Sequence, residues 1–143
     1  MIALRDVSID FVSASFTAIM GPSGSGKTTM LQCAAGPAQP TSGSVSIADT
    51  GITGMGELCR ALITRLDVIF ADEPTGALDS STGQEILSLL RASVDELGQT
   101  VIMVTHEPTA AAHADRVLFL RDGVVVSTLC HPTVATITDY LAR

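Results

Sequence analysis

The fold of this chain is decided by residues 16–31, FTAIMGPSGSGKTTML, where a short apolar run leads into a glycine-rich turn. The turn matches G-x-x-x-x-G-K-[ST], whose glycines allow successive backbone N–H groups to wrap closely around a phosphate chain. The amine of Lys27 can reach the β- and γ-phosphates, and the hydroxyl of Thr28 can ligate Mg²⁺. A chance glycine turn is the plain alternative, but this turn follows a predicted strand and opens a predicted helix. We therefore predict phosphate binding by Gly21, Pro22, Ser23, Gly24, Ser25, Gly26, Lys27, Thr28 and Thr29.

The hydrophobic pattern predicts strands that alternate with helices, as in α/β folds with a mostly parallel sheet. Continuously apolar runs are typical of strands that are covered on both faces. Such runs occupy residues 16–20, 68–71 and 101–105. Period-2 alternation predicts half-exposed strands at residues 7–11 and 44–48.

Helices are predicted over residues 27–35, 57–65, 82–97 and 133–142. The third of these begins at a Thr82-x-x-Glu85 capping box and ends at Gly98. Its apolar positions form one predicted face: Ile86, Leu87, Leu89, Leu90, Val94 and Leu97. A hairpin is predicted at Asp122-Gly123, between two short apolar runs.

Composition limits the class of protein and its partners. A net charge of −7 argues against broad binding of nucleic acid or anionic membranes, since both require a positive surface. No apolar run approaches the ~20 residues of a membrane span, and charged residues interrupt the N-terminal segment, so we expect a cytoplasmic protein without a signal peptide. The spacing of Cys33, Cys59 and Cys130 does not suggest a disulfide or zinc site, and we expect three buried apolar thiols.

Acidic and imidazole side chains follow two of the apolar strands. Asp72 and Glu73 end the run VIFA, where Asp72 can hold Mg²⁺ and Glu73 can orient or deprotonate a water. His106 ends the run VIMVT, and the carboxyl ends of parallel strands line the same crevice. The plain alternative for all three is a strand end that emerges into solvent. Asp79 precedes a predicted helix and could be only a turn or capping residue.

Four motifs in this order, GPSGSGKTT, VIFADEPTGALDS, VIMVTHE and ADRVLFLRDG, resemble the ATP-binding subunit of an ABC transporter. The branch that they resemble serves lipoprotein-release and macrolide-export permeases. The resemblance implies a P-loop NTPase (RecA-like) core with a mostly parallel sheet and a small antiparallel β portion on its N-terminal side. It also implies that ATP and Mg²⁺ bind, that two copies pair around two ATP molecules, and that a transmembrane permease holds the protein at the inner face of the plasma membrane.

The resemblance assigns a role to each motif of this sequence. Residues 21–28 correspond to the Walker A loop, and residues 68–72 to the Walker B strand, which makes Thr28 and Asp72 magnesium ligands. Glu73 corresponds to the catalytic base and His106 to the switch histidine. Residues 76–79 correspond to the D-loop, which places Asp79 at the nucleotide. The family also stacks an aromatic residue on adenine; Phe11 and Phe16 are available here, but their strand settings favour core packing.

The chain departs from the family between Lys27 and Asp72, which lie only 45 residues apart. The Q-loop glutamine, the helical subdomain and the LSGGQ-type signature are missing from this interval. We therefore expect one truncated nucleotide-binding domain over residues 1–143, with an internal excision near residues 54–59. This loss predicts that the strand over residues 68–71 becomes an edge, and that hydrolysis is impaired. A nucleotide-binding remnant with neither hydrolysis nor a transport role remains an alternative, and a small P-loop kinase is a distant third.

Overall fold

A five-stranded sheet organises the part of the chain that the computed structural model describes: residues 9–22, 26–27, 29–30, 46–47, 50–51, 68–76 and 78–142. The strand order is β4-β5-β1-β6-β7. The strands are β1 (Phe16–Met20), β4 (Val68–Asp72), β5 (Thr100–Val104), β6 (Arg116–Arg121) and β7 (Val124–Cys130). The pairs β4–β5, β5–β1 and β1–β6 are parallel, and only β7 runs antiparallel, against β6. The predicted α/β fold with a mostly parallel sheet is confirmed.

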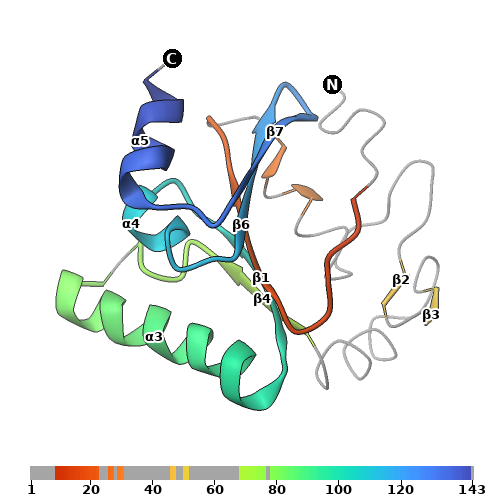
Figure 1. Cartoon of the computed structure of the whole chain (residues 1–143), viewed down its shortest axis with the longest axis vertical. Coiled ribbons are helices and arrows are strands. Elements are labelled where there is room, and N and C mark those ends of the chain that lie inside the picture. The colour runs from red at the N-terminus through yellow and green to blue at the C-terminus, as the bar shows by residue number, and fades with distance from the viewer. Residues whose placement is uncertain are drawn as a thin grey trace.

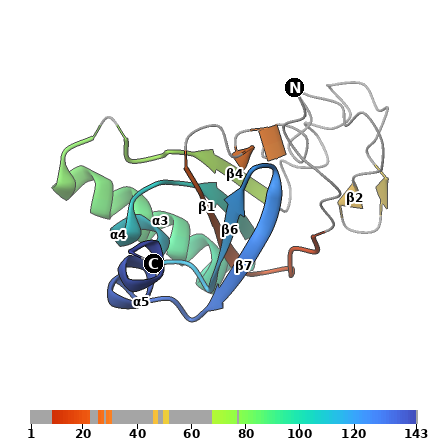
Figure 2. The ribbon, with the colours of Figure 1, turned by 90° about the horizontal axis from the view of Figure 1, so that it is seen from above.

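Three helices lie on the same side of the sheet (Figure 1; Figure 2). They are α3 (Ser80–Leu97), α4 (Pro108–Ala111) and α5 (Val134–Leu141). A separate antiparallel pair, β2 (Ser46–Ile47) with β3 (Thr50–Gly51), precedes β4 in the chain. None of the described helices is both long and apolar enough to cross a membrane.

The sheet separates two apolar clusters, because alternate side chains of a strand point to opposite faces. Phe16, Ala18 and Met20 of β1 belong to the cluster that α3, α4 and α5 cover. Ile19 belongs to the cluster on the other face, together with Met30. All five residues of β1 and of β5 are buried, as their continuously apolar sequences predict.

The start of α3 differs from the predicted capping box. Asp79 is the N-cap, and its carboxylate accepts a hydrogen bond from the backbone N–H of Thr82 at 2.9 Å. The helix therefore begins at Ser80, two residues earlier than predicted, because a cap must precede the first turn whose N–H groups it satisfies. The predicted end is confirmed: Gly98 adopts a left-handed conformation with φ 67°, which glycine tolerates best.

The predicted apolar face of α3 is partly wrong. Leu87 and Val94 are buried against the sheet, whereas Leu89 and Leu97 are 66% and 72% exposed. Leu89 lies about 150° around the helix from Leu87 and Val94. Leu97 stands on the buried side but in the last turn, where the helix ends.

The strand predicted over residues 7–11 is wrong for its described part, since residues 9–12 form no strand. Arg116 instead holds this segment: its guanidinium donates to the backbone carbonyl of Asp10 at 2.6 Å and lies over the Phe11 ring. Phe16 is fully buried in the core, and Phe11 packs against the second apolar cluster. Core packing, rather than adenine stacking, therefore accounts for both aromatic rings.

The predicted hairpin at Asp122-Gly123 is confirmed. Asp122 and Gly123 have φ values of 52° and 82°, the positive pair that a two-residue type I′ turn requires.

Exposure alternates along β7, and Cys130 falls on the exposed series. The expectation that all three thiols are buried is therefore wrong for Cys130, whereas Cys33 and Cys59 lie outside the described residues.

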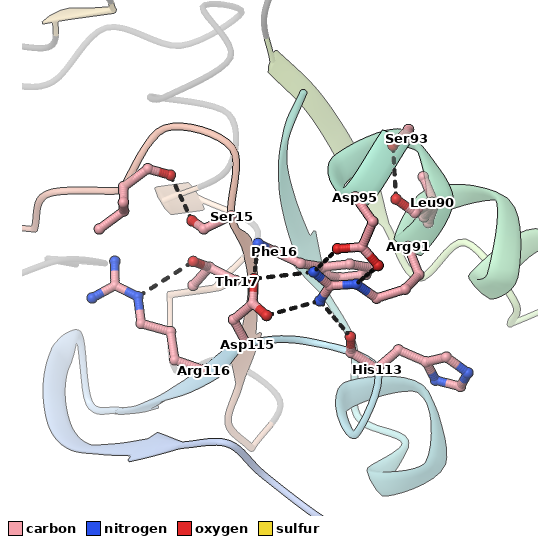
Figure 3. Close-up of polar contacts among 11 residues, drawn as sticks. Ser15, Phe16, Thr17, Leu90, Arg91, Ser93, Asp95, His113, Asp115 and Arg116 are labelled. Carbon is pink, nitrogen blue, oxygen red and sulfur yellow. Dashed lines mark hydrogen bonds and ion pairs between the residues drawn. The ribbon is translucent and has the colours of Figure 1, made fainter. Parts of the chain in front are cut away.

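A polar cluster closes the end of the sheet opposite the glycine-rich turn (Figure 3). The Asp115 carboxylate accepts the backbone N–H of Phe16 at 2.9 Å and the guanidinium of Arg91 at 3.0 Å. Arg91 also pairs with Asp95 at 2.7 Å along α3. These bonds join β1, α3 and the start of β6.

Strand β4 lies at the end of the sheet, with β5 on one side and no other described strand beyond it. The expectation that this apolar strand is an edge is confirmed within the described residues. The proposed excision near residues 54–59 and the predicted helix over residues 57–65 lie outside the described residues.

Candidate nucleotide-binding site

Parallel pairing brings the candidate residues to one edge of the sheet. In the register of the sheet, Val104 lies opposite both Asp72 of β4 and Ile19 of β1. Gly21, Glu73 and His106 follow these strand ends within two residues, so all three emerge at the carboxyl edge. This edge is where open α/β sheets bind ligands.

The described part of the glycine-rich turn has the backbone expected for a phosphate cradle. Gly26 has φ 100°, a conformation that a residue with a side chain would adopt only with strain. The carbonyl of Gly26 accepts the N–H of Met30 at 2.8 Å, so a helix begins directly after it. Lys27 and Thr29 lie in this first helical turn, while Ser23, Gly24, Ser25 and Thr28 lie outside the described residues. The turn therefore joins a buried strand to a helix, as its sequence predicts.

Glu73 and His106 are in direct contact across the strand ends. The Nδ1 atom of His106 lies 3.0 Å from Oε1 of Glu73, and the two side chains are 65% and 30% exposed. The backbone N–H of Glu73 donates to the carbonyl of Val104 at 2.8 Å, which extends the β4–β5 ladder by one residue. Glu73 then turns with φ 49°, a left-handed conformation that directs the chain away from the sheet. A carboxylate and an imidazole thus share one hydrogen bond at the site.

The electrostatics of the site favour the charged form of His106. The hydrogen bond and the charge of Glu73 raise the pKa of His106 above the ordinary 6.5, and the charge of Glu107 adds to this. The charge of Lys27 lowers the same pKa, which shows that the lysine lies within electrostatic reach of the histidine. Residues from three separate motifs therefore act on one another.

The donor set at the end of β4 suits a magnesium ion. The side chain of Asp72, the last residue of β4, is exposed at the carboxyl edge of the sheet, from which Glu73 also emerges. Mg²⁺ prefers carboxylate and hydroxyl oxygens and retains several waters, so one exposed carboxylate is a suitable protein ligand. Thr28, the other predicted ligand, lies outside the described residues.

Asp79 occupies a different setting from the other predicted site residues. Its carboxylate caps α3, and its hydrogen bonds with Thr82 lower its pKa below the ordinary value. Its described hydrogen bonds stay within the first turn of the helix. The capping role that local chemistry allowed is confirmed, and contact with a nucleotide remains a prediction.

Two residues at this edge were missed from the sequence, Thr75 and Glu107. The hydroxyl of Thr75 donates to the Glu107 carboxylate at 3.4 Å, which links the two loops that carry Glu73 and His106. Their positions in the sequence could have indicated them. Thr75 lies two residues after Glu73, and Glu107 lies one residue after His106, at the ends of adjacent strands.

The chain is similar to known ATP-binding proteins in sequence. Residues 4–56 match the family model described as ABC transporter. The macrolide export ATP-binding/permease protein MacB of Neisseria meningitidis serogroup B is 50% identical over 70 residues, which are 49% of this chain and 11% of that protein. A probable export ATP-binding/permease protein of Pseudomonas fluorescens is 47% identical over 78 residues, 54% of this chain and 12% of that protein. The match therefore spans about a tenth of the length of these relatives.

The fold is similar to solved structures over most of the chain. The dimeric structure of MJ0796, a bacterial ABC transporter cassette, gives a TM-score of 0.82 at 25% identity and covers 90% of both chains. The structure of cbiO1 from Clostridium perfringens, part of the ABC transporter complex cbiONQ, gives 0.75 at 19% identity over 96% of this chain and 84% of that one. Together with the sequence match and the geometry of the site, these likenesses make the chain homologous to MacB-type export ATP-binding proteins over about half of its length, and similar in fold to ABC transporter cassettes.

Proposed function

We propose that this chain binds Mg-ATP in the turn of residues 21–28 and hydrolyses it slowly, as the ATP-binding component of an export system of the macrolide-export type. The observation that carries the proposal is the 3.0 Å contact between Glu73 and His106. This contact lies at the edge where the turn containing Lys27 leaves the sheet. A carboxylate that is fixed by an imidazole beside a phosphate cradle is an arrangement suited to attack by water.

Each candidate site residue has a role in this proposal. Backbone N–H groups of the turn and the amine of Lys27 hold the β- and γ-phosphates. Thr28 and Asp72 hold the magnesium ion, which neutralises phosphate charge when bound. Glu73 accepts the proton of the attacking water through the carboxylate oxygen that does not face His106. His106 orients Glu73 and, in its protonated form, donates a hydrogen bond toward the γ-phosphate.

The partners of the domain follow from its relatives. The similar proteins of Neisseria and Pseudomonas are named ATP-binding/permease proteins, and the MJ0796 cassette is described as dimeric. We propose that two copies pair around ATP, with Asp79 near the shared nucleotide, and that a permease holds them at the inner face of the plasma membrane. The acidic chain makes nucleic acid an unsuitable partner.

The short interval between Lys27 and Asp72 leads us to expect slow ATP hydrolysis. Phosphoryl transfer depends on preorganised donors around the γ-phosphate, and the 45-residue interval holds neither a signature motif nor a Q-loop glutamine. We therefore expect turnover orders of magnitude below that of a complete domain. The same interval favours the second candidate function, a nucleotide-binding remnant that neither hydrolyses ATP nor serves transport.

Binding and release measured separately distinguish these functions. Calorimetric titration of the wild type with Mg-ATP tests binding, and Lys27→Ala is expected to weaken binding by at least about tenfold because a phosphate loses its charged partner. Phosphate release is then compared between the wild type, Glu73→Gln and Glu85→Gln. The last variant is the matched control, since Glu85 is an exposed glutamate on α3.

Release that falls in Glu73→Gln but not in Glu85→Gln supports the ATPase. Binding of Mg-ATP with equal background release in all three proteins supports the remnant and refutes hydrolysis. Absence of Mg-ATP binding refutes both functions.

A further inference from the structure

Thr75 lies at a junction of three elements. It follows β4 by three residues and is only 8% exposed. Its hydroxyl donates to Oε2 of Glu107 at 3.4 Å. Its methyl side packs against Gly83 in α3, where an added Cβ would stand 3.4 Å from Cβ of Thr75 and 3.5 Å from its Cγ2. The first turn of α3 therefore supports the threonine from behind, while its hydroxyl points to the loop after β5.

Glu107 is itself anchored to the sheet. Its backbone N–H donates to the hydroxyl of Thr105 at 3.1 Å, and Thr105 is fully buried. The N–H of Thr105 in turn donates to the carbonyl of Ile19 in β1 at 3.1 Å. A hydrogen bond from Thr75 to Glu107 therefore ties the loop after β4 to the central strands through a short, anchored path.

The geometry of the Glu73–His106 pair depends on how these two loops are placed. The imidazole of His106 is 65% exposed, and the only hydrogen bond described for its ring is the one to Glu73. On one side of the pair, the N–H of Glu73 donates to Val104. On the other side, the described residues connect the two loops through Thr75 and Glu107. Among the described contacts between the two loops, losing this second tie leaves the Glu73–Val104 backbone bond and the Glu73–His106 pair itself to hold them.

We propose that Thr75 is a positioning residue for the Glu73–His106 pair and acts through its hydrogen bond to Glu107. The inference rests on the proposed function only for the role of the pair in hydrolysis. The positioning itself concerns the protein without nucleotide. Thr75 holds the Glu107 loop so that Nδ1 of His106, and not Nε2, carries the proton directed to Glu73.

The test reads the imidazole of His106 directly in the nucleotide-free full chain. ¹⁵N NMR about two pH units above the folded-state pKa of His106, which is first measured by titration, reports the ratio of the Nδ1–H to the Nε2–H form of the neutral ring. The wild type is expected to hold mainly the Nδ1–H form, since Nδ1 faces the Glu73 carboxylate. In Thr75→Val, which keeps the shape and removes the hydroxyl, this ratio falls by about fivefold, the factor for one net hydrogen bond.

Further variants separate positioning from folding. Thr75→Ser retains the hydroxyl and restores the ratio to within about twofold of the wild type. Thr109→Val, the same chemical change at an exposed threonine of α4, leaves the ratio unchanged. Glu107→Ala lowers the ratio as Thr75→Val does, and the double variant falls no further, because both changes remove the same bond. Circular dichroism confirms that each variant is folded.

In phosphate-release assays, Thr75→Val is expected to lower kcat with little change in KM, because Thr75 is only 8% exposed and acts through Glu107. An unchanged tautomer ratio in Thr75→Val overturns the inference, as does a double variant whose effects add. A wild type that releases no phosphate refutes the proposed function but leaves the tautomer ratio as a valid test of Thr75.

Discussion

Replacing Asp115 by alanine is expected to destabilise the fold more than any other single change in the polar cluster of Arg91, Asp95 and Asp115. The carboxylate accepts the N–H of Phe16 at 2.9 Å, and Phe16 is fully buried. A buried donor left without a partner costs about 1–3 kcal/mol, and the half-exposed pair with Arg91 adds at most about 1 kcal/mol. We therefore expect Asp115→Ala to lower the free energy of unfolding by about 2–3 kcal/mol.

Two variants isolate the contribution of the backbone acceptor. Asp115→Asn keeps an oxygen for the Phe16 N–H and is expected to cost less than about 1 kcal/mol. Asp95→Ala removes the exposed helix-surface pair with Arg91 and is expected to cost the least of the three. Urea unfolding followed by circular dichroism measures all three, and Asp115→Ala should also lower Tm by roughly 5–10 °C. Equal losses in Asp115→Ala and Asp95→Ala would refute the reasoning.

Three other expectations concern a cap, a titration and an edge. Gly98→Ala should lower the free energy of unfolding by about 1 kcal/mol, because alanine is strained in the left-handed backbone of this position. Steric overlap adds nothing to this cost, since an added Cβ meets nothing within 4 Å. An unchanged urea midpoint of unfolding would contradict this expectation. The raised pKa of His106 means that its contribution to stability is complete below 6.5 and is lost as pH rises through the higher folded value. Glu73→Gln should reduce this slope, because Glu73 is the largest cause of the raised pKa. An NMR titration of His106 with a pKa at or below 6.5 would oppose the expectation. Strand β4 is apolar and lies at the edge of the sheet that the described residues form, so the apparent mass in light scattering should rise with protein concentration. A reversible melt of a monomer at every concentration would exclude such association.

Much of the fold could be predicted from the sequence, because each confirmed element has a local cause. The apolar run of β1 is buried at every position, and the Asp122-Gly123 pair supplies the two positive φ values of the hairpin. Helix α3 shows the limit of such reasoning: residues 79–82, DSST, are all capping types, and sequence alone did not select Asp79 over Thr82. In the structure, the local hydrogen bond from the Thr82 N–H to the Asp79 carboxylate fixes the start of the helix.

The remaining errors arise from contacts between segments that are distant in sequence. The alternating pattern of residues 7–11 suits a strand, but residues 9–12 form no strand, and Arg116, more than 100 residues away, binds this segment. The link between Thr75 and Glu107 spans 32 residues and depends on the register of β4 against β5. By contrast, Glu73 and His106 could be paired from sequence, because each ends a strand of one parallel sheet.

The most direct test of the account is single-turnover phosphate release from Mg-ATP by the wild type and by Glu73→Gln. A positioned general base contributes about 10²–10⁴-fold, so release by the wild type should exceed that of Glu73→Gln by at least about hundredfold, while both bind Mg-ATP equally. Equal rates in the two proteins would contradict the claim that Glu73 and His106 form a working hydrolytic pair.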